Sequence, residues 1–274
     1  MSDCLFEKKS DGVALITLNR PESMNAMGGE LMPLLAQYLD ECERDRAVRC
    51  VAVTGAGRAF CAGGDVKGMA SPSRGGGGAG ERPSVGQIVE RGAAGLASSQ
   101  RATSLRLHSM PKPTVALVNG AAAGAGLSLA LAADIRFCSE QARFITAFAK
   151  VALSGDYGGS FLLQRLIGPG RAREAYFLSE TIDAQKALDL GIANHVVPPD
   201  ELLDKGLEYC ARLAKGPTGV YARMKANFNF GETATLAELL EQEALNMTLS
   251  SVSKDHREGA MSFVEKREPN FVGE

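Results

Sequence analysis

Two glycine-rich segments, each placed directly after an apolar run, can present backbone N–H groups to a ligand. The first is Cys61-Ala62-Gly63-Gly64-Asp65, and the second runs from Gly120 to Gly126. An apolar helix is expected directly after the second segment, over Leu127–Ala133, and the first N–H groups of a helix have no partner inside it. Two such donors aimed at one point form an oxyanion hole, in which each donor lowers the barrier to an enolate by about 3 kcal/mol. Close packing of the helix on a sheet would explain the second segment as well.

The segments around these turns predict an α/β core followed by a helical region. Strands are expected where short apolar runs end in turn residues: Val13–Leu18, Cys50–Thr54, Thr114–Val118, Ile135–Cys138, Arg143–Ile145 and Ala193–Val197. Helices are expected between them at residues 31–42, 96–107, 127–133, 158–167, 171–178 and 184–190. After residue 198 every remaining pattern is helical, at 201–214, 218–227, 236–249 and 254–266. The chain therefore divides into an α/β core (1–199) and a C-terminal helical region (200–274).

The segment from Gly68 to Gly95 is unlike its neighbours, because it has few large apolar residues and an unbroken run of glycines at 75–78. This composition predicts a mobile loop or linker. A phosphate-binding loop is a weaker interpretation, since neither a preceding strand nor a following Lys-Ser/Thr pair is present. A flap that covers a neighbouring site is a third interpretation.

The bulk composition excludes several classes of protein. The 274 residues have a net charge of −2 and no basic stripe, so nucleic acids and anionic membranes are not expected as partners. No uncharged apolar run is long enough for a membrane span, and the N-terminus lacks the apolar segment of a signal peptide. The six cysteines include no C-x-x-C pair, which indicates reduced thiols in a cytoplasmic protein. The scattered His108, His195 and His256 lack metal-binding spacing, so no metal site is predicted.

Several short motifs follow one another along nearly the whole chain. They are Asn19-Arg20-Pro21 with Met24-Asn25-Ala26, Gly57 to Asp65, Val118-Asn119-Gly120 with Gly124-Ala125-Gly126, Arg171 to Ala175, Ala187 to Gly191, and Glu258-Gly259 to Phe263 with Glu265-Lys266-Arg267. Each is weak alone, but in this order they resemble the enoyl-CoA hydratase/isomerase (crotonase) superfamily. The resemblance implies a spiral of ββα units, a C-terminal helical trimerisation region, and a homotrimer or dimer of trimers. It also implies an acyl-CoA thioester substrate, with coenzyme A carried on that substrate and no separate cofactor.

The resemblance assigns roles to residues on both glycine turns. By position, the N–H groups of Gly64 and Ala125 are the two oxyanion donors. The residues implied to bind coenzyme A are Met24, Ala26, Ala62, Gly63, Asp65, Val66, Phe263 and Lys266, the last two in the same chain or in a neighbouring subunit. The acyl pocket is expected to be shaped by Leu96–Leu107, the Gly68–Gly95 segment and Tyr157.

The acidic residues depart from the pattern of the family's hydratases, which carry two glutamates that hold and activate water. Ser128 and Phe148 stand at these positions here. Asp156 instead lies just before the helix expected at 158–167, at the turn where the family's isomerases and aryl-CoA dehalogenases place an acid. A lone carboxylate can move a proton between two carbons if its pKa is near the working pH, and Phe148 would raise that pKa by desolvation. We therefore interpret Asp156 as the proton shuttle of a double-bond isomerase, with an N-cap as its structural alternative.

Other functions fit parts of the pattern. A hydratase with one acid is open if Ser128 helps to hold water, and a non-catalytic acyl-CoA binder needs no acid. An aryl-CoA dehalogenase is disfavoured because the chain has no tryptophan. An NAD(P) short-chain dehydrogenase would use Gly120-x-x-x-Gly124-x-Gly126 with Glu140, Tyr221 and Lys225. That motif belongs to the first strand of its fold, whereas more than about a hundred organised residues precede it here.

Overall fold

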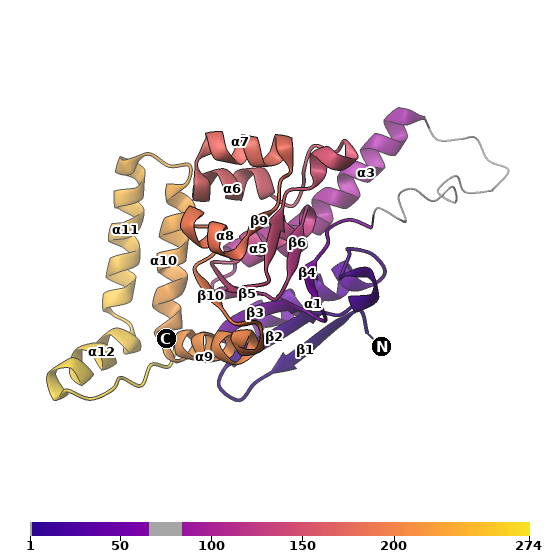
Figure 1. The fold of residues 1–274 in the computed structure, drawn as a ribbon. Coiled ribbons are helices and arrows are strands. Elements are labelled where there is room, and N and C mark those ends of the chain that lie inside the picture. The colour runs from indigo at the N-terminus through magenta and orange to yellow at the C-terminus, as the bar shows by residue number, and fades with distance from the viewer. Residues whose placement is uncertain (1, 66–83) are drawn as a thin grey trace.

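Two sheets make up the α/β part of the molecule (Figure 1). The computed structural model describes residues 2–65 and 84–274. Within them the larger sheet has the order β1 (Cys4–Lys8), β2 (Val13–Leu18), β3 (Cys50–Gly55), β5 (Thr114–Val118), β7 (Ile135–Ser139) and β10 (His195–Val197). The smaller sheet has the order β4 (Ala59–Cys61), β6 (Ala121–Ala123), β8 (Arg143–Ile145) and β9 (Ile182–Asp183). Neighbouring strands are parallel except for the antiparallel pairs β1–β2 and β8–β9.

The larger sheet is buried on both faces, because its central strands are apolar at successive positions. On β3, Val51 belongs to the main core cluster, to which α1 (Leu31–Arg44) contributes its apolar face. The next residue, Ala52, belongs to a second cluster that is completed by α9 (Leu202–Lys215). Helices thus cover the sheet from two sides, and the predicted α/β core is confirmed.

The predicted helices are present, most of them within a few residues of their expected ends. Besides α1 and α9 they are α3 (Val85–Gln100), α4 (Arg106–Ser109), α5 (Ala125–Leu131), α6 (Gly159–Ile167), α7 (Pro169–Leu178), α8 (Ala184–Leu190), α10 (Thr218–Gly231), α11 (Leu236–Ser251) and α12 (Lys254–Glu265). Shorter helical turns are η1 (Pro21–Ser23), η3 (Arg101–Leu105), η4 (Phe148–Val151) and η5 (Pro199–Glu201). The strands β1, β4, β6 and β9 escaped prediction, because most have only two or three residues, too few for a periodic signal.

The loop prediction for Gly68–Gly95 is wrong at its C-terminal end. Ser84 and Gln87 form a capping box, in which each side chain accepts a hydrogen bond from the backbone N–H of the other, and α3 begins at Val85. Residues 85–95 are exposed on all sides, and although Val85, Ile88, Val89 and Leu96 recur at helical spacing, glycines at 86, 92 and 95 interrupt the pattern. Residues 68–83, including the glycine run and the postulated flap, lie outside the described residues.

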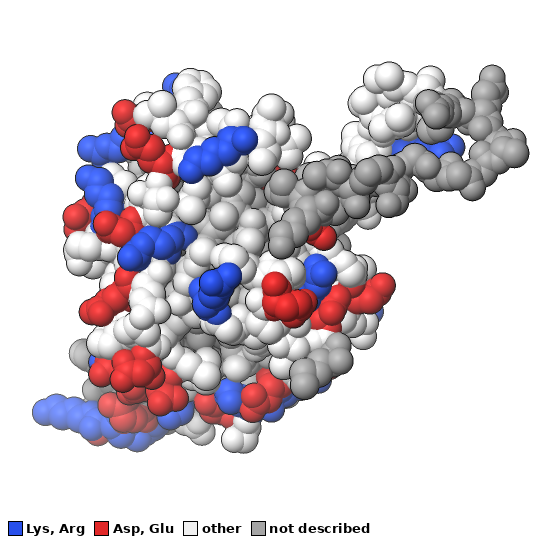
Figure 2. Space-filling model, turned by 45° about the vertical axis from the view of Figure 1, so that its right-hand side comes forward, with Lys and Arg blue, Asp and Glu red and all other residues white. Residues whose placement is uncertain are grey.

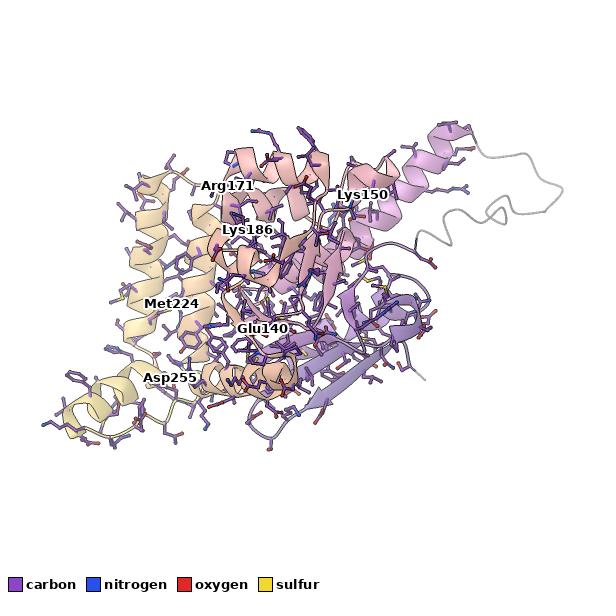
Figure 3. All side chains as sticks on the ribbon, viewed as in Figure 1. Glu140, Lys150, Arg171, Lys186, Met224 and Asp255 are labelled. Atoms are coloured by element: carbon purple, nitrogen blue, oxygen red, sulfur yellow. The ribbon has the colours of Figure 1, made fainter. Side chains whose placement is uncertain are left out.

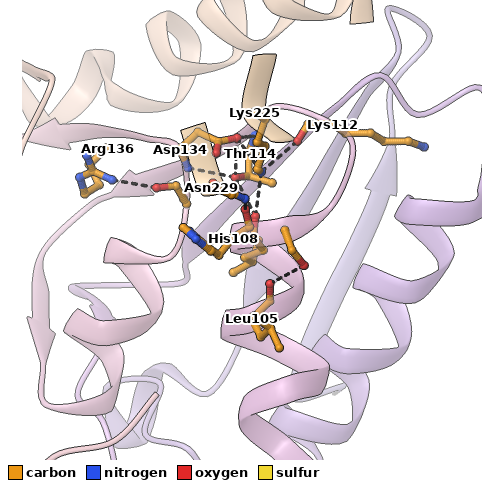
Figure 4. Close-up of polar contacts among 11 residues, drawn as sticks. Leu105, His108, Lys112, Thr114, Asp134, Arg136, Lys225 and Asn229 are labelled. Carbon is orange, nitrogen blue, oxygen red and sulfur yellow. Dashed lines mark hydrogen bonds and ion pairs between the residues drawn. The ribbon is translucent and has the colours of Figure 1, made fainter. Parts of the chain in front are cut away.

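The last three helices extend away from the sheets, whereas α9 packs on them (Figure 1). Lys225 fastens α10 to the core, as Figure 4 shows. Its ammonium group donates to the carbonyl oxygens of Leu107 and Lys112 and pairs with Asp134 at 2.9 Å. Burial lowers the pKa of Lys225, although Asp134 opposes this effect. The predicted C-terminal helical region is confirmed, while its boundary at residue 200 and its part in assembly stay predictions.

The C-terminal tail folds back and ties α12 to the core. Asp255, at the start of α12 (Figure 3), accepts hydrogen bonds from the N–H groups of Val272 and Gly273. On the core side, the Arg49 guanidinium donates to the carbonyl oxygen of Phe271 at 2.9 Å. The tail therefore links two parts of the chain that are far apart in sequence.

Charged side chains of both signs are interspersed on the face of the molecule shown in Figure 2. Among the described residues, none of the helices combines the length and the apolar character needed to cross a membrane. All six cysteines are buried free thiols.

Candidate active site

The two glycine turns emerge side by side from the smaller sheet. β4 and β6 pair in parallel with Cys61 opposite Ala122, so the turn after each strand lies at the same edge of the sheet. A Cβ atom added to Gly63 would lie 3.2 Å from the Ala125 nitrogen and 2.6 Å from the Ala123 carbonyl oxygen. The turns are therefore in direct contact, which the oxyanion interpretation requires.

Two backbone donors remain at this junction. The N–H groups of Gly64 and Ala125 donate no hydrogen bond to any other residue that the structure describes. Ala125 is the first residue of α5, so its N–H group belongs to the open first turn of a helix. Gly126, the next residue, touches the Cys61 carbonyl group so closely that any side chain there would collide with it. Glycine thus allows the start of α5 to approach the first turn, and both donors to lie near one place.

The segment Met24–Ala26 lies against the first glycine turn. The Met24 carbonyl oxygen accepts a hydrogen bond from the Ala62 N–H group at 3.0 Å, and the Met27 N–H group donates to Gly63 at 2.7 Å. Asn25 secures the segment, because its buried side-chain amide donates to backbone carbonyl groups between β3 and β4. The structure therefore brings together most of the residues predicted to bind coenzyme A: Met24, Ala26, Ala62, Gly63 and Asp65. Val66 lies outside the described residues.

Phe263 and Lys266 lie far from these turns within the chain. Phe263 is 86% exposed on α12, and Lys266 follows the helix in a left-handed conformation, with a φ of 53°. Figure 1 shows α12 at the end of the molecule opposite α3. The structure leaves only the neighbouring-subunit form of this prediction, in which α12 of one chain reaches the site of another.

Asp156 lies on a tight turn between η4 and α6. Its neighbours Gly155, Tyr157 and Gly158 have φ values of 109°, 50° and 80°, so the chain reverses sharply around the acid. The N-cap of α6 is Gly158, and no side chain caps this helix. The structural alternative, in which Asp156 is the N-cap, is therefore wrong.

The carboxyl group of Asp156 is partly buried, and its Oδ1 atom has no hydrogen-bond partner among the described residues. Desolvation raises the pKa of Asp156 from 3.8 to about 6, as expected from its apolar neighbours. Buried oxygens are nearly always paired in folded proteins, so an unpaired one marks a place where a functional explanation is needed. A carboxyl group in this state can take up and release a proton near neutral pH.

Phe148 connects the acid turn with the second glycine turn. Cβ atoms added to Gly124 and to Gly155 would each lie 3.7 Å from an atom of the Phe148 ring. The ring also stacks on Tyr176, with centroids 5.8 Å apart and an angle of 16° between the planes. The start of α5 and the turn of Asp156 therefore meet at one aromatic ring.

Ser128 lies one turn beyond Ala125 on α5, where its hydroxyl group faces the Tyr176 phenol. A Cβ atom added to Gly159 would collide with both hydroxyl groups, so this glycine leaves the space that they occupy. Burial raises the pKa of Tyr176 to about 12, against the opposing effect of a hydrogen bond from Ser128. The Tyr176 phenol therefore stays neutral over the working pH range.

Tyr176 was not singled out from the sequence, and Ser99 and Gln100 were included only within Leu96–Leu107, the segment expected to shape the acyl pocket with Tyr157. The Tyr157 N–H group donates to Gln100 Oε1 at 2.7 Å, and the Tyr157 hydroxyl lies 2.9 Å from Ser99 Oγ. These partners lie more than fifty residues from Tyr157 in sequence, so no local spacing marks them. The only available signal was a pair of polar residues at the point where an otherwise exposed helix meets the protein body.

A cleft of about 550 Å³ between α10 and the core is separate from these turns. Its lining includes Leu131, Leu162, Tyr209, Tyr221, Met224 and Lys225, and none of the predicted catalytic or coenzyme A-binding residues. Lys225 is bonded to Asp134 and to backbone carbonyl groups, so it anchors α10. The Tyr-x-x-x-Lys pattern of the dehydrogenase interpretation therefore has a structural explanation.

Known proteins are similar to this chain over its whole length. The sequence pattern of the family described as enoyl-CoA hydratase/isomerase matches residues 8–274. The chain is 37% identical to 1,2-epoxyphenylacetyl-CoA isomerase from Escherichia coli, with complete coverage of both sequences. It is 31% identical to crotonyl-CoA hydratase from Syntrophomonas wolfei, over 97% of this chain and 96% of that one.

Solved structures agree with these relatives and confirm the predicted crotonase-like fold. The crystal structure of an enoyl-CoA hydratase from Bacillus anthracis superposes with a TM-score of 0.88 at 31% identity, and the match covers the whole of both chains. The chain is therefore an enzyme of the enoyl-CoA hydratase/isomerase family, which acts on acyl-CoA thioesters.

Proposed function

We propose that this enzyme moves a double bond within an enoyl-CoA thioester, with Asp156 as the proton shuttle. The state of Asp156 carries the proposal: Oδ1 is buried without a partner in the described part of the chain, and desolvation raises the pKa to about 6. A carboxylate of this kind accepts and returns a proton without a second acid. Ser128 and Phe148 stand at the positions of the two hydratase glutamates, and neither side chain has a carboxyl group.

In the proposed reaction the Asp156 carboxylate removes a proton from the carbon next to the thioester carbonyl. The electrons of the broken C–H bond form an enolate, whose oxygen accepts hydrogen bonds from the N–H groups of Gly64 and Ala125. The protonated Asp156 then gives its proton to the far carbon of the original double bond. The remaining electrons form the new double bond next to the carbonyl, so no atom is gained or lost.

The coenzyme A part of the substrate is proposed to lie along Met24–Ala26 and residues 62–66. Phe263 and Lys266 of a neighbouring subunit complete this contact in the proposal. No other cofactor is required, because the enolate is stabilised by backbone N–H groups and the proton is carried by a side chain.

A homotrimer or dimer of trimers is the proposed assembly. Large apolar side chains of α11 and α12 are exposed in the single chain, and such surfaces are typical of subunit contacts. They include Leu236, Leu240, Met247, Phe263 and Val264. Sedimentation analysis should give the mass of three or six chains, and a stable monomer would contradict this arrangement.

A cytoplasmic location is proposed from the six free thiols.

Hydration of an enoyl-CoA is a second candidate, and one observation favours it. The hydroxyl groups of Ser128 and Tyr176 face each other above Gly159, close to Asp156, and two hydroxyls can hold a water molecule. Among the relatives, one is named an isomerase and another a hydratase, so the names support both reactions.

The test is the Asp156→Asn variant, assayed on a panel of enoyl-CoA esters by chromatography and mass spectrometry. Isomerisation leaves the product mass unchanged, whereas hydration adds the mass of water. If Asp156 is the shuttle, the variant should lose about 10²- to 10⁴-fold in kcat, as expected for a general base. The exposed Asp200→Asn is the matched control and should retain full activity.

Two outcomes would contradict the proposal. A loss smaller than about tenfold in Asp156→Asn would exclude Asp156 as the shuttle. Wild-type protein whose melting temperature rises with CoA esters, without turnover of any ester, would instead indicate a non-catalytic binder.

A further inference from the structure

A pair of hydrogen bonds joins helix α3 to the turn that carries Asp156. The Tyr157 N–H group donates to Gln100 Oε1 at 2.7 Å, and the Tyr157 hydroxyl lies 2.9 Å from Ser99 Oγ. Tyr157 is only 6% exposed, so both bonds are largely shielded from solvent. Losing one partner of such a bond leaves a buried polar group unpaired, which destabilises the folded arrangement. These two contacts, the Tyr157 clamp, therefore restrain the acid turn.

The helix itself holds the two residues of the clamp in place. Directly after Gln100 it forms the π-helical turn Arg101–Leu105, a feature that is often found at functional sites. The hydroxyl group of buried Thr103 donates to the Ser99 carbonyl oxygen at 2.7 Å, and the Ser104 hydroxyl donates to the Gln100 carbonyl oxygen at 3.2 Å. Ser99 and Gln100 are thus fixed through their backbone while their side chains hold Tyr157.

Tyr157 is a residue that needs such restraint. Its φ of 50° lies in the left-handed region, which is unfavourable for a residue other than glycine. Gln100 accepts its hydrogen bond from the N–H group of the peptide that joins Asp156 to Tyr157. The orientation of this peptide determines the direction in which the Asp156 side chain leaves the backbone.

We propose that Gln100 is a positioning residue, which orients Asp156 through the Tyr157 N–H group, with Ser99 as the second contact. This inference rests on the proposed function, because it concerns the proton transfer assigned to Asp156. The helix is exposed from residue 85 to residue 96 and first meets the protein body near Ser99 and Gln100 (Figure 1). The clamp is therefore the place where this protruding helix acts on the acid turn.

The decisive variant is Gln100→Met, which keeps the length of the side chain and removes the acceptor. Hydrogen exchange of the Tyr157 amide should become faster by about tenfold or more, because its partner is lost. In the isomerase assay, kcat should fall by about tenfold while KM changes by less than about twofold, since the substrate still binds but the base is misplaced.

Two further variants separate positioning from a general effect on folding. Gln100→Glu keeps an acceptor oxygen, so at about pH 8 it should restore both the protection of the Tyr157 amide and most of kcat. Gln141→Met, at an exposed turn between β7 and β8, is the matched control and should change neither quantity. Ser99→Ala removes only the second contact and should lower kcat by about threefold and the melting temperature by a few degrees, because the buried Tyr157 hydroxyl loses its partner.

The outcomes distinguish this inference from the function on which it rests. Unchanged exchange of the Tyr157 amide in Gln100→Met would overturn the clamp. Faster exchange with unchanged kcat, in an enzyme that Asp156→Asn inactivates, would overturn the positioning role and leave the proposed function intact. Full activity of Asp156→Asn would overturn both.

Discussion

The donor half and the acid half of the candidate site are built in opposite ways. The donor half is backbone: Gly64 and Ala125 follow β4 and β6 closely, and these strands pair with each other. The acid half is a single carboxyl group on a turn that Gln100 holds through the Tyr157 N–H group, with Tyr176 of α7 near the carboxyl group. Backbone geometry is fixed by the fold, whereas side chains can be exchanged one at a time. We therefore expect the donor half to fail abruptly under substitution and the acid half to respond in steps.

Within the donor half, the largest effect on kcat is expected from Gly126→Ala. The added methyl group would collide with the backbone carbonyl of Cys61, which cannot move without separating β4 from α5. With one donor displaced, kcat should fall by about 10²- to 10³-fold. Gly170→Ala is the control, because nothing lies within 4 Å of a Cβ atom there. Circular dichroism should show that the variant is folded. A folded Gly126→Ala enzyme with normal kcat would contradict the expectation that the donor half fails abruptly under substitution.

A smaller effect is expected on the free energy of unfolding, because the folded protein buries the Asp156 carboxyl group. Since burial raises the pKa of Asp156 from 3.8 to about 6, ionisation is harder in the folded than in the unfolded chain. The penalty is absent below about pH 4, grows as pH rises, and is complete above about pH 6. Asp156→Asn should therefore be more stable than the wild type at about pH 8, by about 1–2 kcal/mol after allowance for the partial exposure of the carboxyl group.

Urea unfolding of both proteins measures this difference directly, because all other titrating groups are shared. The two unfolding midpoints should converge as the pH approaches about 4, where the wild-type carboxyl group is largely neutral. Equal stability of the wild type and Asp156→Asn at both pH values would mean that Asp156 is solvated in the folded protein. The acid half would then lack the raised pKa that a proton shuttle needs.

The smallest effect is expected from Tyr176→Phe. The ring keeps its stack on Phe148, and only the hydroxyl group that faces Ser128 is lost. Isomerisation should slow by no more than about threefold, and unfolding should require about 1 kcal/mol less. A selective loss of hydration activity in the same variant would favour the second candidate function. A loss of isomerisation as large as that of Asp156→Asn would show that a lone acid is insufficient.

The donor half was predictable from sequence because its requirements are local. A glycine such as Gly63, with a φ of 84°, is needed where the backbone turns, although β4 and β6, the short strands that lead into the two turns, were not predicted. The acid half was predictable only as far as Asp156 itself. Its pKa depends on burial that only the folded chain creates, and Tyr176, which stacks on Phe148, comes from a different helix.

The missed part of the fold has a similar explanation. The stretch 85–95 is helical by virtue of its capping box and its local propensity, and no apolar stripe faces a core. Val85, Ile88, Val89 and Leu96 have helical spacing, but the glycines among them and the glycine run at 75–78 favoured a loop. The clamp residues lie within Leu96–Leu107, the segment expected to line the acyl pocket, but their contacts with Tyr157 could not be predicted because the partners are distant in the chain.

The π-helical turn at Arg101–Leu105 also changes the phase of the helix that contains it. One residue more than an α-helical turn requires rotates everything beyond it by about 100°. The clamp side chains before the turn and the buried Leu107 after it can therefore point to different neighbours from a single rod. Removing one residue from this turn would restore a continuous α-helix and rotate Gln100 away from Tyr157. Lengthening the exposed end of α3 would leave the angle between Gln100 and Leu107 around the helix axis unchanged.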